Sequence, residues 1–172
     1  MRYPSALVFL LVALPVSVQA PTSVVWEQIG AGLGVDVPAP TEADSLLLVA
    51  SLQASELVRG VDAALQGQAP EWEWVARHNL AFVSVNTHLA VAVFAAAVAS
   101  ATESKSCRDA QKRLVEFGLM GASEKASEIA RALGTRSPGG GALEAAFLEH
   151  VSASRASIAT ALAAWSEGVG DE

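Results

Sequence analysis

Three histidines and one cysteine are the residues of this chain that are best suited to metal binding or nucleophilic chemistry. His78, His88 and His150 occur in no HExxH or Glu-x-x-His pair, the spacings that place metal ligands on one helix face. On a helix, His78 and His88 would lie about 80° apart in rotation and roughly three turns apart along the axis. One metal ion could hardly bridge them, so the sequence predicts solvent-facing histidines and no metal site.

Cys107 is the only cysteine and therefore cannot form a disulfide within the chain. No histidine or acidic residue is placed by the local sequence to activate its thiol as a nucleophile. Two interpretations remain for this residue. It is either a small buried apolar side chain or the site of an intermolecular disulfide with another chain.

Motifs of the common enzyme classes are absent from the sequence. There is no Gly-x-Ser-x-Gly elbow, no Walker loop and no Cys-x-x-Cys-His site for covalent haem. The glycine-rich run 30–34 lacks the helix that a phosphate-binding loop needs directly after it, because Pro38 and Pro40 follow. The sequence therefore favours a protein that is not an enzyme.

Two asparagines share one face of a predicted helix with large apolar side chains. Asn79 and Asn86 are seven residues apart, on the face that also carries Trp72 and Phe82. Amides on an apolar face cost free energy unless each finds a hydrogen-bonding partner. These four residues either form a polar ligand site inside a bundle, or the asparagines make interhelical hydrogen bonds that fix the helix register. The first interpretation predicts a carrier of non-covalently bound haem or of a lipid.

An export signal is predicted at Met1–Ala20. Arg2 supplies positive charge, and the apolar run Ala6–Val18 is shorter than the about 20 residues that a membrane-spanning helix needs. Small side chains before Pro21 fit a cleavage site, whereas the Pro21 ring directly after the cut fits a peptidase badly. The sequence thus leaves two alternatives, which are removal of the segment or its retention as a short anchor.

The elements that would position these residues are helices. A first helix is predicted from Thr41, whose hydroxyl can cap it, to Gly67, and a second from Pro70 to Thr102. A third begins near Ser104 and carries Cys107, Ala110, Leu114 and Phe117 on one side. Gly118 and Gly121 are expected to interrupt it, so that a shorter helix follows over 123–133. A loop over 135–141 precedes the last helix, 142–165.

The second predicted helix has an unusual composition. Residues 80–102 contain no Asp, Glu, Lys or Arg, and apolar side chains occur on every side of the helix. Such a helix either lies at the centre of a bundle or enters a membrane. Ser84, Asn86, Thr87 and His88 interrupt its apolar character, and much of the remainder is alanine. Burial within protein is therefore favoured, with membrane contact as the alternative.

Together these patterns predict an all-α protein. We expect an antiparallel four-helix-type bundle with an extra short helix, preceded by the signal segment. The predicted divisions are an export signal at 1–20, an irregular segment at 21–40 that allows a short helical turn around 24–29, the bundle at 41–167 and a frayed tail at 168–172.

Charge and the missing motifs narrow the function. The formal net charge is −7 and no basic run is present, which argues against a nucleic-acid partner. The leading hypothesis is an exported binding module, periplasmic or extracellular, that contacts another protein or a second copy of itself. The alternatives are a carrier of a small apolar ligand or haem, and a membrane-associated subunit that uses residues 80–102.

Overall fold

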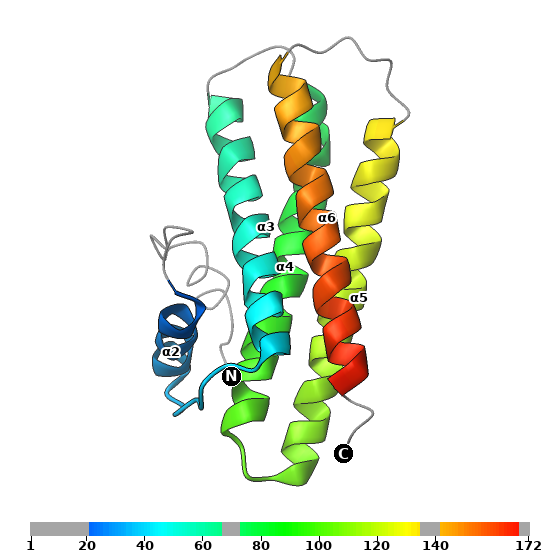
Figure 1. Ribbon diagram of the computed structural model, residues 1–172. Helices are drawn as coiled ribbons and strands as arrows, with labels where there is room; N and C mark the ends of the chain where they lie inside the picture. The colour runs from blue at the N-terminus through cyan, green and yellow to red at the C-terminus, as the bar shows by residue number, and fades with distance from the viewer. Residues whose placement is uncertain (1–20, 67–72, 135–141, 169–172) are drawn as a thin grey trace, which may run out of the picture.

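A computed structural model describes residues 21–66, 73–134 and 142–168 of the protein (Figure 1). These residues form helices α2 (Thr22–Leu33), α3 (Glu42–Gln66), α4 (Glu73–Ala101), α5 (Lys105–Gly134) and α6 (Ala142–Gly168). No strand occurs within the described ranges. The prediction of an all-α fold is confirmed. The predicted signal at 1–20 and the predicted second-helix start at Pro70 lie outside the described residues.

Helices α3 to α6 form a bundle in which successive helices run in opposite directions (Figure 1). Helix α3 packs against α4 and α6, and α5 packs against the same two helices. Each of the four helices sends fully buried side chains into a common core, among them Leu47, Leu89, Leu119 and Ile158. Removing such side chains from water is the main source of stability in a bundle without disulfides.

Helix α4 explains the long charge-free segment of the sequence. It contacts α2, α3 and α5, so neighbouring helices cover it on several sides. Its inward residues in the second half are mostly alanines, including Ala92, Ala95, Ala96 and Ala97, which are all buried. A polar side chain at these positions would be buried without water, which accounts for the absence of charge.

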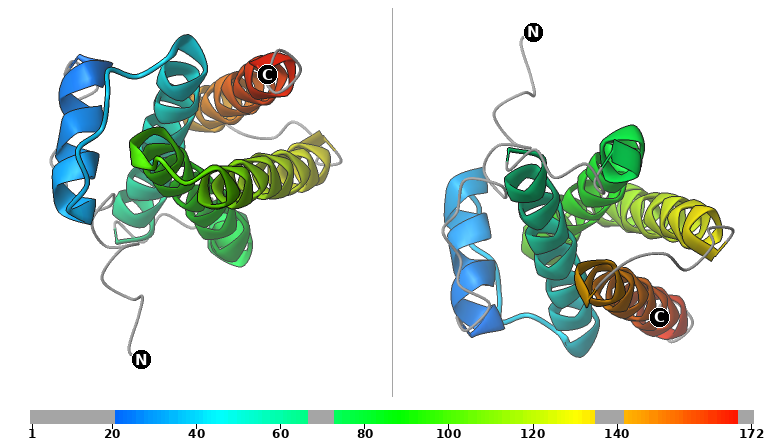
Figure 2. Two further views of the ribbon diagram at one scale, coloured as in Figure 1. Left: turned by 90° about the horizontal axis from the view of Figure 1, so that it is seen from below. Right: turned by 90° about the horizontal axis from the view of Figure 1, so that it is seen from above.

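The N-terminal segment is more regular than predicted, because the short helical turn allowed around 24–29 is part of a full helix, Thr22–Leu33. It forms α2, and the buried side chains of Val25, Trp26 and Ile29 pack against the bundle. Gly30 and Gly32 lie within this helix, and only Gly34 ends it. Gly34 adopts a left-handed conformation (φ 69°), and the N–H groups of Gly34 and Val35 bond back to carbonyls in the last turn. The short helix α2 thus lies on the N-terminal side of the bundle (Figure 2), and it is not the short helix that the sequence predicted over 123–133.

Helix α5 also departs from its prediction, because it continues through both glycines. A Cβ atom at Gly118 would lie 2.6 Å from the His88 carbonyl oxygen and 2.9 Å from the Ala92 Cβ. A Cβ atom at Gly121 would overlap the His88 ring. The glycines therefore serve close packing between α4 and α5 and do not break the helix. No separate helix begins at Ser123.

The predicted cap at Thr41 is confirmed. The Asp44 N–H donates to Thr41 Oγ1 at 3.2 Å, and Asp44 Oδ2 accepts from the Thr41 N–H at 2.9 Å. Asp44 Oδ2 also accepts from the Thr41 hydroxyl at 2.7 Å. These reciprocal bonds satisfy backbone groups at the start of α3 and fix where this helix begins.

Candidate functional site

Asn86 is bonded inside the bundle. Its side chain is buried, and its Oδ1 accepts a hydrogen bond from Ser55 Oγ of α3 at 2.8 Å. The side chain of Asn79 and the whole of Trp72 lie outside the described residues. A buried bond between α3 and α4 is the contact that the register interpretation predicts. The interpretation of Asn86 as a ligand group stays a prediction.

A second polar contact joins α3 to α6. Ser157 Oγ donates to Gln53 Oε1 at 2.6 Å. Ser51, one turn before Ser55 on α3, is fully buried, and its hydroxyl has no partner among the described residues. The bundle thus contains polar contacts at two helix interfaces, and these bonds favour one helix register over others.

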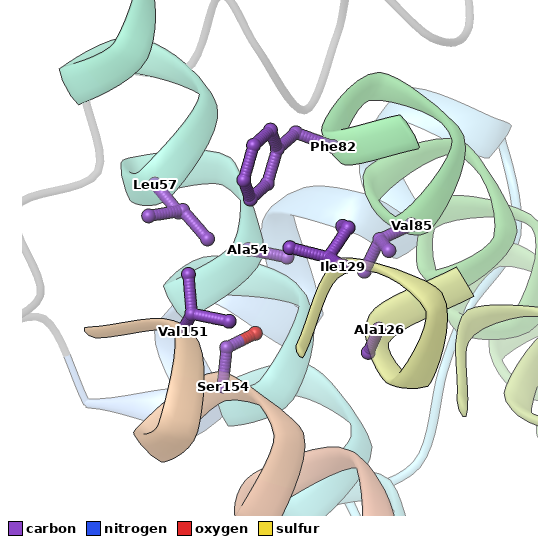
Figure 3. A pocket seen from close by; sticks show the side chains of 8 residues that line it. All are labelled: Ala54, Leu57, Phe82, Val85, Ala126, Ile129, Val151 and Ser154. Carbon is purple, nitrogen blue, oxygen red and sulfur yellow. The ribbon is translucent and has the colours of Figure 1, made fainter. Parts of the chain in front are cut away.

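Phe82, the remaining predicted ligand residue, lines a small cavity between the four bundle helices (Figure 3). The cavity measures about 10 Å³. Its walls are the side chains of Ala54, Leu57, Phe82, Val85, Ala126, Ile129, Val151 and Ser154. This space is about what one water molecule requires. Haem or a lipid would not fit here without separation of the helices.

A larger groove lies elsewhere, at the end of the bundle where α3 begins and α6 ends. This end groove has a volume of about 740 Å³. It is lined by Pro38, Thr41, Glu42, Ala43, Asp44, Ala96, Ala99, Ser100, Arg108, Lys112, Ala164, Trp165 and Glu167. The indole N–H of Trp165 is shielded from solvent and has no acceptor among the described residues. No local motif marks these residues, because four different helices contribute them.

The charged groups of the end groove have both signs. The acidic residues Glu42, Asp44 and Glu167 and the basic residues Arg108 and Lys112 all line it. The Asp44 carboxylate is already engaged in the cap of α3, and Arg108 Nη2 donates to the Thr102 carbonyl oxygen at 3.0 Å. The groove therefore presents mixed polarity and does not select strongly for one sign of charge.

The outer face of α5 carries exposed apolar side chains. Leu114 is 43% exposed, and Phe117 and Met120 are each 64% exposed. We call these three residues the α5 patch. The side of this helix that faces the core instead carries Val115, Leu119 and other buried residues. The sequence pattern places Leu114 and Phe117 on one side of the helix, but nothing in that pattern indicates that this side is exposed.

Charged residues flank the α5 patch at both ends. Arg113 and Glu124 are exposed, and neither forms an ion pair with another described residue. Asp109, four residues before Arg113 on the same helix, forms no ion pair with it. Lys125 is bound to the Glu128 carboxylate at 2.9 Å. This hydrogen bond and the Glu128 charge, with a smaller contribution from the Glu124 charge, raise the pKa of Lys125. Glu124 thus remains available to a cation from outside the chain.

His88 lies beside the patch and is half-buried, which corrects the prediction of a solvent-facing ring. Its Nδ1 donates to the Ser84 carbonyl oxygen at 2.7 Å, since a carbonyl can only accept. The ring centroid is 6.1 Å from that of Phe117, at an interplanar angle of 46°. The missing side chain at Gly121 leaves room for the His88 ring, which therefore lies in the contact between α4 and α5. His88 supports one side of the Phe117 ring while the other side stays open.

Cys107 is half-buried in the first turn of α5, where its N–H donates to Ser104 Oγ at 3.4 Å. Its intermolecular disulfide stays a prediction. Within the described ranges, no three His, Cys, Asp or Glu side chains are grouped as a metal site would require.

Helix α4 contains a segment, Ala81–Ala101, that is long and apolar enough to cross a membrane by length and composition. Just over half of its apolar window, 56%, is buried inside the bundle. The core helix of a soluble bundle has the same properties. Membrane contact through residues 80–102 therefore stays a prediction.

No protein-family model, curated protein or solved structure matches this chain. Its function must therefore be inferred from the geometry of its own surfaces, of which the α5 patch and the end groove are the two main candidates.

Proposed function

We propose that this chain is an exported, non-catalytic helical module that binds a partner protein through the α5 patch. The observation that carries the proposal is the exposure of Leu114, Phe117 and Met120 within two turns of one helix. Neighbouring exposed apolar side chains mark interaction sites more often than scattered ones do. Covering them with a partner would contribute about 25 cal/mol per Å² of apolar surface removed from water.

The support beneath the patch favours binding by a preformed surface. Helix α5 is held against α4 at Gly118 and Gly121, where no side chain separates the two helices. Phe117 additionally rests against the His88 ring. A surface that is already ordered loses little conformational entropy on binding, so a modest contact area can suffice.

The proposal that the module is exported rests on residues 1–20. A cut after Ala20 would leave every described helix complete, because α2 begins at Thr22. Pro21, the residue after the cut, then serves as the N-cap residue of α2. The mature module would work in the periplasm or outside the cell, and its net charge without Arg2 would be more negative still.

Co-purification from the native host tests the proposal. The wild-type chain, Phe117→Glu and Val24→Glu would be compared, because Val24 is also exposed (42%) but lies on α2. We expect one defined complex with the wild type, its loss with Phe117→Glu, and its retention with Val24→Glu. Equal retention by both variants would show that α5 is not the binding face.

A second candidate function, the carrier of a small apolar ligand, is favoured by the end groove. Its volume of about 740 Å³ is within the usual range of ligand sites, whereas the cavity at Phe82 is near 10 Å³. Non-covalent haem or a lipid would contact Ala96, Ala99 and Trp165. Native mass spectrometry of host-purified protein tests this function, since a carrier retains extra mass that Ala99→Trp removes. A bare mass for the wild type would contradict it.

A further inference from the structure

We propose that the partner of the α5 patch is a second copy of this chain. In this arrangement two α5 helices pack antiparallel around a two-fold axis that passes between Phe117 and Met120. The inference rests on the proposed function, because it names the occupant of the same patch. It follows from the order of residues along the outer side of α5 and from their charges.

The outer residues of α5 recur at alternating steps of three and four, which is the spacing of a helix-packing seam. In chain order the seam consists of Ser106, Ala110, Arg113, Phe117, Met120, Glu124, Ser127 and Arg131. The two-fold axis crosses the seam midway between Phe117 and Met120. Each seam residue therefore faces the residue of the second copy that lies equally far from this midpoint in the opposite direction. Phe117 then meets Met120 of the second copy, and the reverse contact forms as well.

The charges of the seam are complementary in this register. Arg113 faces Glu124 of the second copy, and Glu124 faces its Arg113, so the two-fold axis creates two ion pairs. Both residues are exposed and have no ion pair within the described chain, while Lys125 is bound to Glu128. A parallel arrangement would place Arg113 beside Arg113 and Glu124 beside Glu124. The charge pattern therefore selects the antiparallel dimer.

Space around the seam also permits the contact. Figure 2 shows α5 at one edge of the bundle, with α2 on the opposite side of α3 and α4. Beyond the ion pairs, Ala110 faces Ser127 of the second copy, and both are small enough for close helix approach. One helix from each copy buries less than a standard interface, so we expect a weak dimer with a Kd between roughly 1 µM and 1 mM.

Charge exchange tests the register directly, with sedimentation velocity as the readout. The wild type should dimerise as its concentration rises, whereas Arg113→Glu and Glu124→Arg should each remain monomeric because like charges meet twice. An equimolar mixture of the two single variants should form a heterodimer, since opposite charges then meet at both positions. The double variant should dimerise with itself again.

Two exposed residues of α3 provide matched controls. Arg59→Glu and Glu56→Arg make the same charge changes on another helix, where the side chains are 43% and 45% exposed. They should dimerise like the wild type. This result would show that the charges at the seam positions, and not the net charge of the chain, determine dimerisation. Circular dichroism would establish that every variant remains helical.

The failures of the two proposals can be told apart. A wild type that stays monomeric up to millimolar concentration, or single variants that dimerise as it does, would overturn the second-copy inference. If Phe117→Glu nevertheless abolishes a complex with a different protein, the proposed function stands. If Phe117→Glu abolishes neither the self-association nor a complex with a different protein, both proposals are wrong.

Discussion

Gly118 and Gly121 each have a distinct effect at the scale of single residues, although both lie in the α4–α5 contact. The atom nearest to a Cβ at Gly118 would be the His88 carbonyl oxygen, which the α4 backbone fixes. The atoms nearest to a Cβ at Gly121 would belong to the His88 ring, which can rotate. The same substitution should therefore have different consequences at the two positions.

We predict that Gly118→Ala lowers the free energy of unfolding by about 1–3 kcal/mol, because overpacking outweighs the roughly 1 kcal/mol gain in helix propensity. Gly121→Ala should also destabilise the wild type. In a His88→Ala background it should instead stabilise by about 0.5–1 kcal/mol, since the obstructing ring is gone. Urea denaturation measures both effects. If Gly121→Ala remained destabilising without His88, the close approach at the ring would not be its cause.

The buried bond between Ser55 and Asn86 leads to a second prediction at this scale. Ser55→Ala should lower the free energy of unfolding by about 1–3 kcal/mol, because a buried amide oxygen loses its donor. The double variant Ser55→Ala, Asn86→Leu should lose less free energy of unfolding than the sum of the losses in the two single variants, since no polar group of this pair is then left unpaired. Strict additivity in chemical denaturation would mean that the bond contributes no coupling.

At the scale of elements, periodicity identified α3, α4 and α6, but it misjudged the segments that contain glycine. A glycine lowers helix propensity wherever it occurs, so Gly30, Gly118 and Gly121 suggested irregular chain or a break. Their role became visible only with their neighbours, because a Cβ at Gly30 would meet Val37 and the other two glycines meet α4. Tertiary packing outweighed local propensity at all three positions.

Helix α2 provides the prediction that belongs to this scale. Trp26 is fully buried, and its indole N–H donates to the Pro38 carbonyl oxygen at 3.1 Å. Trp26→Ala should destabilise by about 3–5 kcal/mol through the cavity it leaves. Trp26→Phe should cost less, because most of the apolar burial remains. Thermal unfolding tests both. No change with Trp26→Ala would show that α2 does not unfold together with the bundle.

The candidate site was less predictable than the fold for the same reason. Sequence alone placed Asn86 and Phe82 on an inner face, and both are buried. It could not find the end groove, whose walls come from four helices, nor decide that Phe117 would stay exposed. Those properties depend on which helix packs beside which, and no local pattern encodes that choice.

At the scale of the whole molecule, the proposed module is a helical bundle whose most exposed large apolar side chains, Phe117 and Met120, lie on α5. From its acidic charge we expect no nucleic-acid partner, and since its single cysteine cannot form an internal disulfide, its stability depends on packing. The dimer proposed for α5 would cover its most exposed apolar residues. Two copies would then present their end grooves and α2 helices to the surroundings.

Export is a prediction about the whole molecule. We expect host-purified protein to begin at Pro21, because a cut after Ala20 leaves α2 intact. Intact-mass spectrometry would then report the mass of residues 21–172. A mass that includes residues 1–20, with the protein in the membrane fraction, would instead indicate the retained anchor.

Photo-crosslinking in the native host tests the central claim, that α5 is the binding face, most directly. A photoreactive amino acid at Phe117 should give one defined adduct, whose cross-linked peptide identifies the partner. The same amino acid at Val24, which is exposed on α2, should give none. In the second-copy arrangement, the peptide joined to position 117 should be the α5 peptide of the second copy, which contains Met120. Adducts at position 24 but not at 117 would contradict the account.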